Sequence, residues 1–220
     1  TVYRRLRQMG IRDSSTVIGA RLGHCLFYEW DYYSVHPAEI LKIWKGGLAS
    51  HGGVFAIILA LVWYSKKVTK KSVWWLFDRM IPAVAVVCFC IRFGNLMNSE
   101  IYGYPTTLPW GFEFVRSREW HQLYEGLPCH PTQIYEMLYC LVAGVTAWVM
   151  YHKYHLQNRV GLITGVSLLI FFGSRFALEF MKNPQVVEET NMTLNIGQWL
   201  SVPLILLGGY LIYKSKTAKV

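Results

Sequence analysis

The sequence predicts an all-α integral membrane protein, a polytopic transmembrane helical bundle of about six full or partial spans with an outward-facing loop or head region. Three observations predict this fold class. Apolar types make up 53% of the 220 residues and charged types only 16%, a balance typical of chains that lie in a bilayer. Nine Trp and 14 Tyr suit the membrane interface, where one edge of the ring stays wet. The apolar residues also gather in separate helix-length runs.

The runs fall at residues 15–28, 51–64, 80–91, 133–151, 160–180 and 198–213. Residues 1–14 are basic and polar, without the apolar core of a secretory signal, so we expect a loop there. A perpendicular helix needs about 20 apolar residues to cross the hydrocarbon, so the first and third runs must be completed by flanking polar residues or enter only partly. The sequence has no internal repeat or flexible linker, which predicts a single membrane-embedded domain over residues 1–220.

Alternating the runs across the membrane distributes the charges unevenly. Segments 1–14, 65–79, 152–159 and 214–220 hold 14 of the 22 Lys and Arg residues, and the opposite segments hold six. The positive-inside bias therefore places the lysine-rich segments in the cytoplasm and the segment 92–132 outside. These cations stand in short clusters between apolar runs, which argues against a nucleic-acid partner. The five cysteines lack zinc or dithiol spacing, and we interpret them as small core residues.

Two polar residues interrupt the run 160–180. Arg175 and Glu179 are four positions apart and share a helix face, where they can pair. A bare arginine in the hydrocarbon costs about 2.5–3.5 kcal/mol on insertion scales, so such residues face a cavity or a polar partner. Arg175 is therefore either half of a structural ion pair or a ligand for an anionic group that Glu179 orients.

A dense polar set follows the run 80–91. Arg92 opens it, and Asn95, Asn98 and Glu100 follow where the chain leaves the hydrocarbon. Amides and carboxylates at an apolar boundary are costly unless they are hydrogen-bonded to each other or to a ligand. Two arginines on one side of the membrane suit a phosphate, because a guanidinium pairs two oxygens at once. A phospholipid headgroup is the phosphate available there.

Two histidines lie on the predicted outer side. His51 stands in a glycine-rich stretch at the start of a run and is either a structural residue or, with its near-neutral ordinary pKa, the best candidate for a general base. His130 precedes Pro131 in a pattern typical of a helix start, so we interpret it as structural.

These segments together resemble the prolipoprotein diacylglyceryl transferase family over nearly the whole chain, from about Ile18 to Gly209. Arg92-Phe93-Gly94-Asn95 with Asn98, Glu100, Tyr102 and Gly103 is similar to the family signature, with Cys90 where that signature commonly opens with glycine. Further matches are Gly19 to His24, Gly46 to Gly53, His130 to Glu136, and Ser174 to Glu179. Family members begin with a further span, so the resemblance implies a chain without the N-terminal span.

The resemblance implies transfer of the diacylglyceryl group from phosphatidylglycerol to the lipobox cysteine of preprolipoproteins, in a bacterial inner membrane and without metal or organic cofactor. His51, Arg92 and Arg175 are then the expected catalytic residues. Substrate-binding residues are expected at Arg92, Asn95, Asn98, Glu100, Gly103, Arg175 and Glu179. Two other classes stay open: an anion or lipid transporter subunit, and an inactive scaffold of the same fold. The expected partners are the two substrates and membrane lipids.

Overall fold

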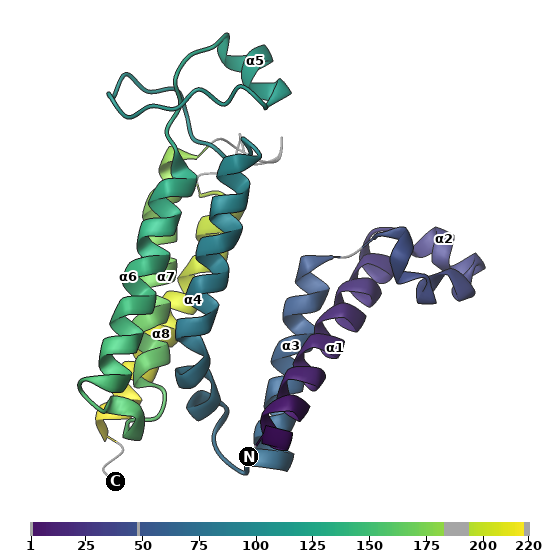
Figure 1. The fold of residues 1–220 in the computed structure, drawn as a ribbon, viewed down its shortest axis with the longest axis vertical. Coiled ribbons are helices and arrows are strands. Elements are labelled where there is room, and N and C mark those ends of the chain that lie inside the picture. Colours follow the sequence, from purple (N-terminus) through teal and green to yellow (C-terminus); the bar gives the residue numbers. More distant parts are fainter. Residues whose placement is uncertain (1, 48, 183–193, 218–220) are drawn as a thin grey trace. The chain divides into compact units, whose positions relative to one another are not determined.

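The structure, a computed structural model, describes residues 2–47, 49–182 and 194–217 and is helical (Figure 1). The α-helices in chain order are α1 (Val2–Phe27), α2 (Trp30–Val35), α3 (Ser50–Tyr64), α4 (Val73–Met97), α5 (Arg118–Tyr124), α6 (Thr132–His152), α7 (Leu162–Leu178) and α8 (Ile196–Thr217). Short turns of 3-10 or π helix lie at Pro37–Leu41, Ile43–Lys45, Ser65–Thr69, Leu156–Asn158 and Glu179–Met181. The chain divides into two compact units, residues 1–76 and 77–220. The single domain over 1–220 stays a prediction.

Among the described residues, five helical segments are long and apolar enough to cross a membrane, which confirms the polytopic all-α fold class. They are Gly52–Thr69, Val73–Met97, Thr132–His152, Leu162–Met181 and Ile196–Ser215. Each corresponds to one of the last five predicted runs. The run expected at 80–91 was too short, because residues 73–79 and 92–97 continue the same helix and bring α4 to 25 residues.

The start of the chain corrects a prediction. Residues 2–14, expected as a loop, form the first half of α1, a helix of 26 residues. Arg, Leu, Gln and Met in this stretch are strong helix formers, so it is helical although it is polar. The same polar residues keep α1 out of the five segments that can span a membrane.

In the first unit, α1 and α3 cross at glycines. A methyl group on Gly52 would overlap the carbonyl oxygen of Gly19 and lie 2.8 Å from the Cα of Gly23. Only hydrogen side chains permit this separation, which is how small residues let membrane helices approach closely.

The Arg21 side chain fastens the segment after α2 to α1. It is buried, and its guanidinium donates to the carbonyl oxygens of Glu39 at 2.7 Å, Ile40 at 2.9 Å and Gly46 at 2.6 Å. It also lies over the Tyr33 ring, 5.1 Å from the centroid. All of these contacts are to its own unit, so Arg21 has a structural role in the described chain.

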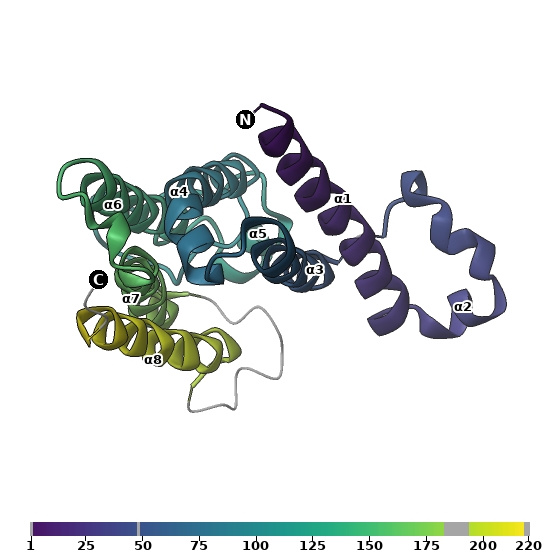
Figure 2. The same ribbon diagram turned by 90° about the horizontal axis from the view of Figure 1, so that it is seen from below.

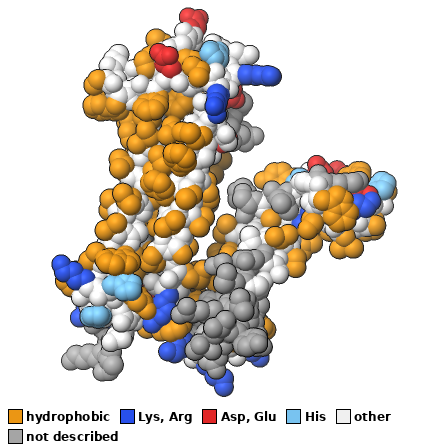
Figure 3. Space-filling model, viewed as in Figure 1, with side chains coloured by type: hydrophobic (Ala, Val, Ile, Leu, Met, Phe, Trp, Pro, Cys, Tyr) orange, Lys and Arg blue, Asp and Glu red, His pale blue; other side chains and the backbone are white. Residues whose placement is uncertain are grey.

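In the second unit, α4, α6, α7 and α8 form a helical bundle, and α7 lies between α6 and α8 (Figure 2). The α7–α8 contact again uses glycine, since a methyl group on Gly165 would lie 2.8 Å from the carbonyl oxygen of Gly208. Apolar side chains such as Val86, Leu141 and Leu206 are exposed along the bundle. On the face drawn in Figure 3, hydrophobic side chains form a broad band between two charged ends of the bundle. Such a band is the expected surface of a protein that lipid surrounds.

The buried Asp78 carboxylate joins α4 to the first turn of α7. Its oxygens accept from Gly161 N at 2.7 Å, Thr164 N at 2.8 Å and Thr164 Oγ1 at 2.6 Å. The first N–H groups of a helix have no partner within the helix. A side chain from another helix satisfies them here.

Residues 98–131 form a head at the end of the bundle where α4 ends and α6 begins (Figure 1). Its core contains Tyr102, Phe114, Trp120 and Cys129, with the Tyr102 and Phe114 rings stacked 4.8 Å apart. Because α7 runs toward the head and α8 away from it, the ends of four helices meet there (Figure 1).

Candidate active site

Glu136 is a buried carboxylate between two cations at the head end of the bundle. It lies in the second turn of α6, with its Oε2 2.6 Å from Arg92 Nε and its Oε1 2.7 Å from Lys182 Nζ. Lys182 also lies 3.6 Å from Glu179 Oε2. Buried charges are stable only when they are paired. Glu136 therefore holds the end of α4, the start of α6 and the segment after α7 together.

Arg92 is oriented by its neighbours but not enclosed by them. The Nε atom of the guanidinium is paired with the Glu136 carboxylate, and the Nη1 atom donates to Asn95 Oδ1 at 3.3 Å. The side chain stays 20% exposed. A guanidinium has five N–H groups, so donors remain for a planar, bidentate anion.

Arg175, in the last turn of α7, is partly buried, and no hydrogen bond or ion pair joins its side chain to another described residue. Arg92 lies near the end of α4 and Arg175 in the last turn of α7, and both of these helix ends are at the head end of the bundle. An unpaired cation beside a second cation at a membrane boundary is unfavourable unless an anion joins them. The arrangement is therefore suited to an anionic ligand.

The structural ion pair considered for Arg175 and Glu179 is not formed. The four-residue spacing itself is kept, because Glu179 continues α7 as a 3-10 turn and its backbone N–H donates to the carbonyl oxygen of Arg175. Glu179 instead lies near Lys182 and against the start of α8, where a methyl group on Gly197 would lie 2.6 Å from Glu179 Oε1.

Asn95, in the last turn of α4, and Asn98, just after this helix, both donate to the Glu100 carboxylate. Its Oε1 accepts from Asn95 Nδ2 and Asn98 Nδ2, both at 3.1 Å. The Glu100 backbone oxygen accepts from the buried Gln133 Nε2 at 2.7 Å. This cluster fixes the chain as it leaves α4, and it shares Asn95 with Arg92.

Gly103 allows a close backbone contact. Its N–H donates to the carbonyl of His130 at 2.9 Å, and a methyl group on it would overlap the carbonyl oxygen of Met181. The adjacent Lys182 pairs with Gly103 in an isolated bridge. Gly103 therefore determines how closely the Lys182 segment approaches the head.

The structure describes the side chain of only one of the two histidines that were predicted on the outer side. His130 lies just before α6, as predicted, with Nδ1 3.2 Å from the hydroxyl of Tyr135, which accepts from Trp110 Nε1 at 2.9 Å. His51 lies in the first turn of α3, and its side chain is outside the described residues. The base assigned to His51 stays a prediction.

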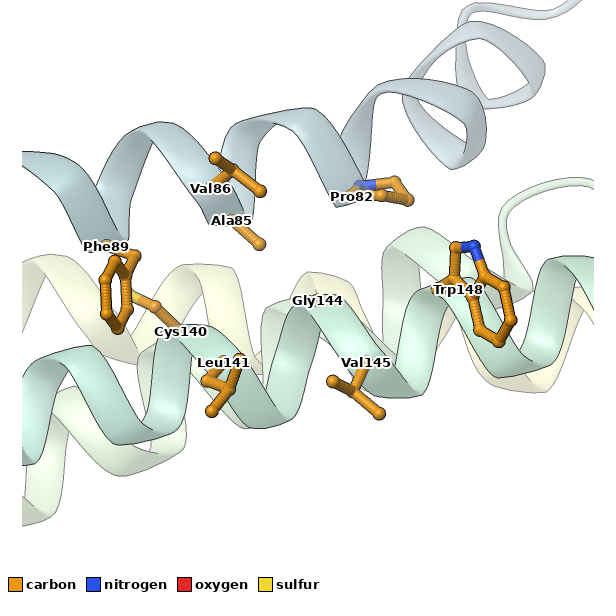
Figure 4. Close-up of a pocket in the computed structure, with 9 residues that line it drawn as sticks. All are labelled: Pro82, Ala85, Val86, Phe89, Cys140, Leu141, Gly144, Val145 and Trp148. Atoms are coloured by element: carbon orange, nitrogen blue, oxygen red, sulfur yellow. The ribbon is translucent and has the colours of Figure 1, made fainter.

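An apolar groove of about 310 Å³ begins one helical turn from Arg92 and Glu136 and runs between α4 and α6 (Figure 4). Its lining is Pro82, Ala85, Val86, Phe89, Cys140, Leu141, Gly144, Val145 and Trp148. Cationic side chains therefore lie at the head end of the apolar groove. Within the described ranges, no three His, Cys, Asp or Glu side chains are grouped to hold a metal ion.

Comparison with known proteins assigns the family. The family model described as prolipoprotein diacylglyceryl transferase matches residues 9–214. The chain belongs to the prolipoprotein diacylglyceryl transferase family. It is 47% identical to the phosphatidylglycerol–prolipoprotein diacylglyceryl transferase of Porphyromonas gingivalis over 207 residues, which cover 91% of this chain and 73% of the relative. The proteins of the same name from Chloroherpeton thalassium and Tolumonas auensis are 45% and 40% identical, over 92% and 93% of this chain and 73% and 76% of theirs.

Two charged residues of the site in this transferase family member, Glu136 and Lys182, were not among the predicted site residues. Glu136 stood four positions into a predicted apolar run, and an acidic residue there is itself a sign of a buried partner. Lys182 stood just after the run that contains Arg175. Neither position reveals that the two side chains meet, because that depends on the register of α6 against the end of α7.

Proposed function

We propose that the chain transfers the diacylglyceryl group of phosphatidylglycerol to the lipobox cysteine of preprolipoproteins, the first step of bacterial lipoprotein maturation. The observation that carries this proposal is that Arg92 and Arg175, the latter unpaired among the described residues, both lie at the head end of the bundle, where the apolar groove between α4 and α6 begins. This arrangement suits a ligand with an anionic head and apolar chains. The names of the relatives give the same two substrates.

In the proposed reaction, the cysteine sulfur attacks the carbon of the diacylglycerol unit that is bonded to the phosphate oxygen. A carbon–sulfur bond forms, the carbon–oxygen bond breaks, and glycerol phosphate leaves with the bonding electrons. Arg92 and Arg175 stabilise the phosphate as its negative charge grows. Glu136 positions Arg92 for this role through its Nε edge.

The remaining predicted residues have supporting roles. His51 accepts the thiol proton, since the thiolate and not the thiol is the nucleophile. Asn95, Asn98 and Glu100 position the headgroup next to Arg92. Gly103 allows the backbone before Lys182 to lie close to the head. Glu179 partly neutralises the positive charge of Lys182.

We also propose that the protein lies in the cytoplasmic membrane of a bacterium with the site toward the outer leaflet. The support is the charge asymmetry of the whole sequence, in which segments 1–14, 65–79, 152–159 and 214–220 hold 14 of the 22 Lys and Arg residues. Lys153, Arg159 and Lys214 lie at the end of the bundle opposite the head, and the positive-inside bias places that end in the cytoplasm.

The test is a transfer assay with the purified chain in detergent, phosphatidylglycerol and a lipobox peptide. The expected products are a diacylglyceryl-modified peptide, seen by mass, and free glycerol phosphate. Arg175→Gln removes a cation without breaking any pair formed with a described residue, and we expect the rate to fall about 100-fold, as for other groups that stabilise developing charge.

The matched control is Arg118→Gln, on the exposed face of the head, which should leave the rate unchanged. Equal rates for Arg175→Gln and the parent would remove the phosphate role of Arg175. Phosphate flux across liposomes without any modified peptide would replace the transferase with a transporter.

A further inference from the structure

The facing residues of α4 and α6, the α4–α6 seam, border the apolar groove, and the two helices come into close contact at Ala85 and Gly144. The helices are antiparallel, and facing residues follow one another at steps of three or four positions on each helix. The observed pairs are Ile81 with Ala147 in one buried cluster, Ala85 with Gly144 in close contact, and Arg92 with Glu136 in an ion pair. The Ala85 contact is tight, because a methyl group on Gly144 would lie 2.9 Å from its Cβ.

Two cysteines occupy the next place in this seam. Cys88 lies on α4 between Ala85 and Arg92, and Cys140 lies on α6 between Glu136 and Gly144. The register set by the Ala85–Gly144 contact and the Arg92–Glu136 ion pair places the two cysteines opposite each other, and both are free thiols in the structure. Figure 4 shows Cys140 extending from α6 toward α4 beside Phe89. A disulfide requires Cα atoms within about 7 Å of each other, and a close helix contact one turn away can bring two facing cysteines to that separation.

We propose that Cys88 and Cys140 are a redox-active pair whose oxidation to an intramolecular disulfide locks α4 to α6 one turn from the Arg92–Glu136 pair. Each thiol gives up its hydrogen, a sulfur–sulfur bond forms, and two electrons and two protons pass to the oxidant. With dissolved oxygen as the oxidant, the reduced product is hydrogen peroxide.

The environment of the pair selects the class of oxidant. Cys140 lines the apolar groove, and the other lining residues are apolar as well. A charged disulfide reagent such as oxidised glutathione is excluded from an apolar groove, whereas an apolar oxidant, such as a membrane quinone, enters it. Access to the sulfur is one of the determinants of the rate of thiol oxidation.

The matched control lies on the same helix. Cys90 is exposed and stands two positions after Cys88, which turns it away from the α4–α6 seam. Cys90→Ser should therefore leave the reaction unchanged, and Cys88→Ser or Cys140→Ser should abolish it. The serine side chain has nearly the same size as cysteine, so each variant tests the sulfur and not the packing.

The experiment oxidises the purified full chain in detergent with copper–phenanthroline and air, blocks the remaining thiols, and maps the digested peptides by mass spectrometry. The expected result is a linked peptide pair containing Cys88 and Cys140, formed by the parent and Cys90→Ser and split again by a phosphine reductant. Oxidised glutathione should give far less of it. This readout does not depend on transferase activity, so it stands or falls separately from the proposed function.

Recovery of both cysteines as separately blocked thiols in the oxidised parent would overturn the proposal. A link between two chains through Cys90 would overturn it as well. The parent alone decides these outcomes, so the proposal remains open to refutation even if a serine variant does not fold.

Discussion

Replacing the buried Glu136 by glutamine should weaken both stability and transfer. The substitution keeps the size of the side chain and one neutral acceptor but removes the charge that faces Arg92 at 2.6 Å and Lys182 at 2.7 Å. Lys182 is 4% exposed, so water cannot replace its partner. Arg92 is 20% exposed and loses less.

The magnitude follows from these contacts. A hydrogen bond to a charged group contributes about 1.5–3 kcal/mol, and breaking a buried ion pair costs about 3–5 kcal/mol. Because solvent screens the Arg92 contact, we take a loss of about 3 kcal/mol, at the lower end. For a chain of this length each kcal/mol moves the unfolding midpoint by roughly 2–4 °C, which gives a fall of about 6–12 °C.

The assay is thermal unfolding in detergent followed by circular dichroism, together with the transfer rate at a temperature where each variant is folded. Glu113→Gln on the exposed surface of the head is the control and should match the parent in both. Lys182→Met added to Glu136→Gln removes the unpaired lysine, so the double variant should lose less stability than the two single variants together, by about 1 kcal/mol or more.

An unchanged midpoint for Glu136→Gln would refute the role of this carboxylate as the link between the three segments. Additive losses in the double variant would show that Glu136 and Lys182 are not coupled. A lowered midpoint with a normal transfer rate would leave the ion pair but remove the positioning of Arg92.

Three further predictions concern other parts of the second unit. Gly103→Ala should lower the transfer rate more than about 10-fold through displacement of the Met181 carbonyl, and a normal rate in the peptide assay would contradict it. Asp78→Asn should lower the unfolding midpoint, because an amide cannot accept all three hydrogen bonds from Gly161 and Thr164 as well as a carboxylate, with a loss of about 1–3 kcal/mol; an unchanged melting curve would exclude it. Burial raises the pKa of the Cys129 thiol above its ordinary 9.0, so iodoacetamide should alkylate it more slowly at pH 9 than a cysteine peptide, and equal rates would contradict this. Above that ordinary pKa the unfolded thiol loses its proton first, so its contribution to stability falls as the pH rises.

The transmembrane fold was predictable because apolar length determines it. Five of six runs correspond to spanning segments, since a bilayer requires about 20 apolar residues per helix. The start of α1 was not predictable from apolar content, because several of its helix-forming residues, such as Arg4, Arg5 and Gln8, are polar. The extension of α4 to residue 97 was missed for the same reason, since Arg92 and Asn95 are helical but not apolar.

The candidate site was predictable residue by residue but not as a network. Arg92 and Arg175 were found because a cation in an apolar run needs a reason to be there. The pairing rule then failed at Glu179, because its carboxylate lies next to Lys182, a partner that the spacing within α7 does not predict. The contact of Glu136 with Arg92 depends on the register between two helices, and no spacing within one helix encodes it.

The Asp78 contact has a consequence for biosynthesis. Helix α7 leaves the ribosome after α4, and its first N–H groups have no acceptor of their own at the end that lies opposite the head. Asp78 is by then already in the chain and supplies acceptors to Gly161 and Thr164. During synthesis, α4 therefore enters the membrane before α7 and already provides the acceptors for the first N–H groups of α7.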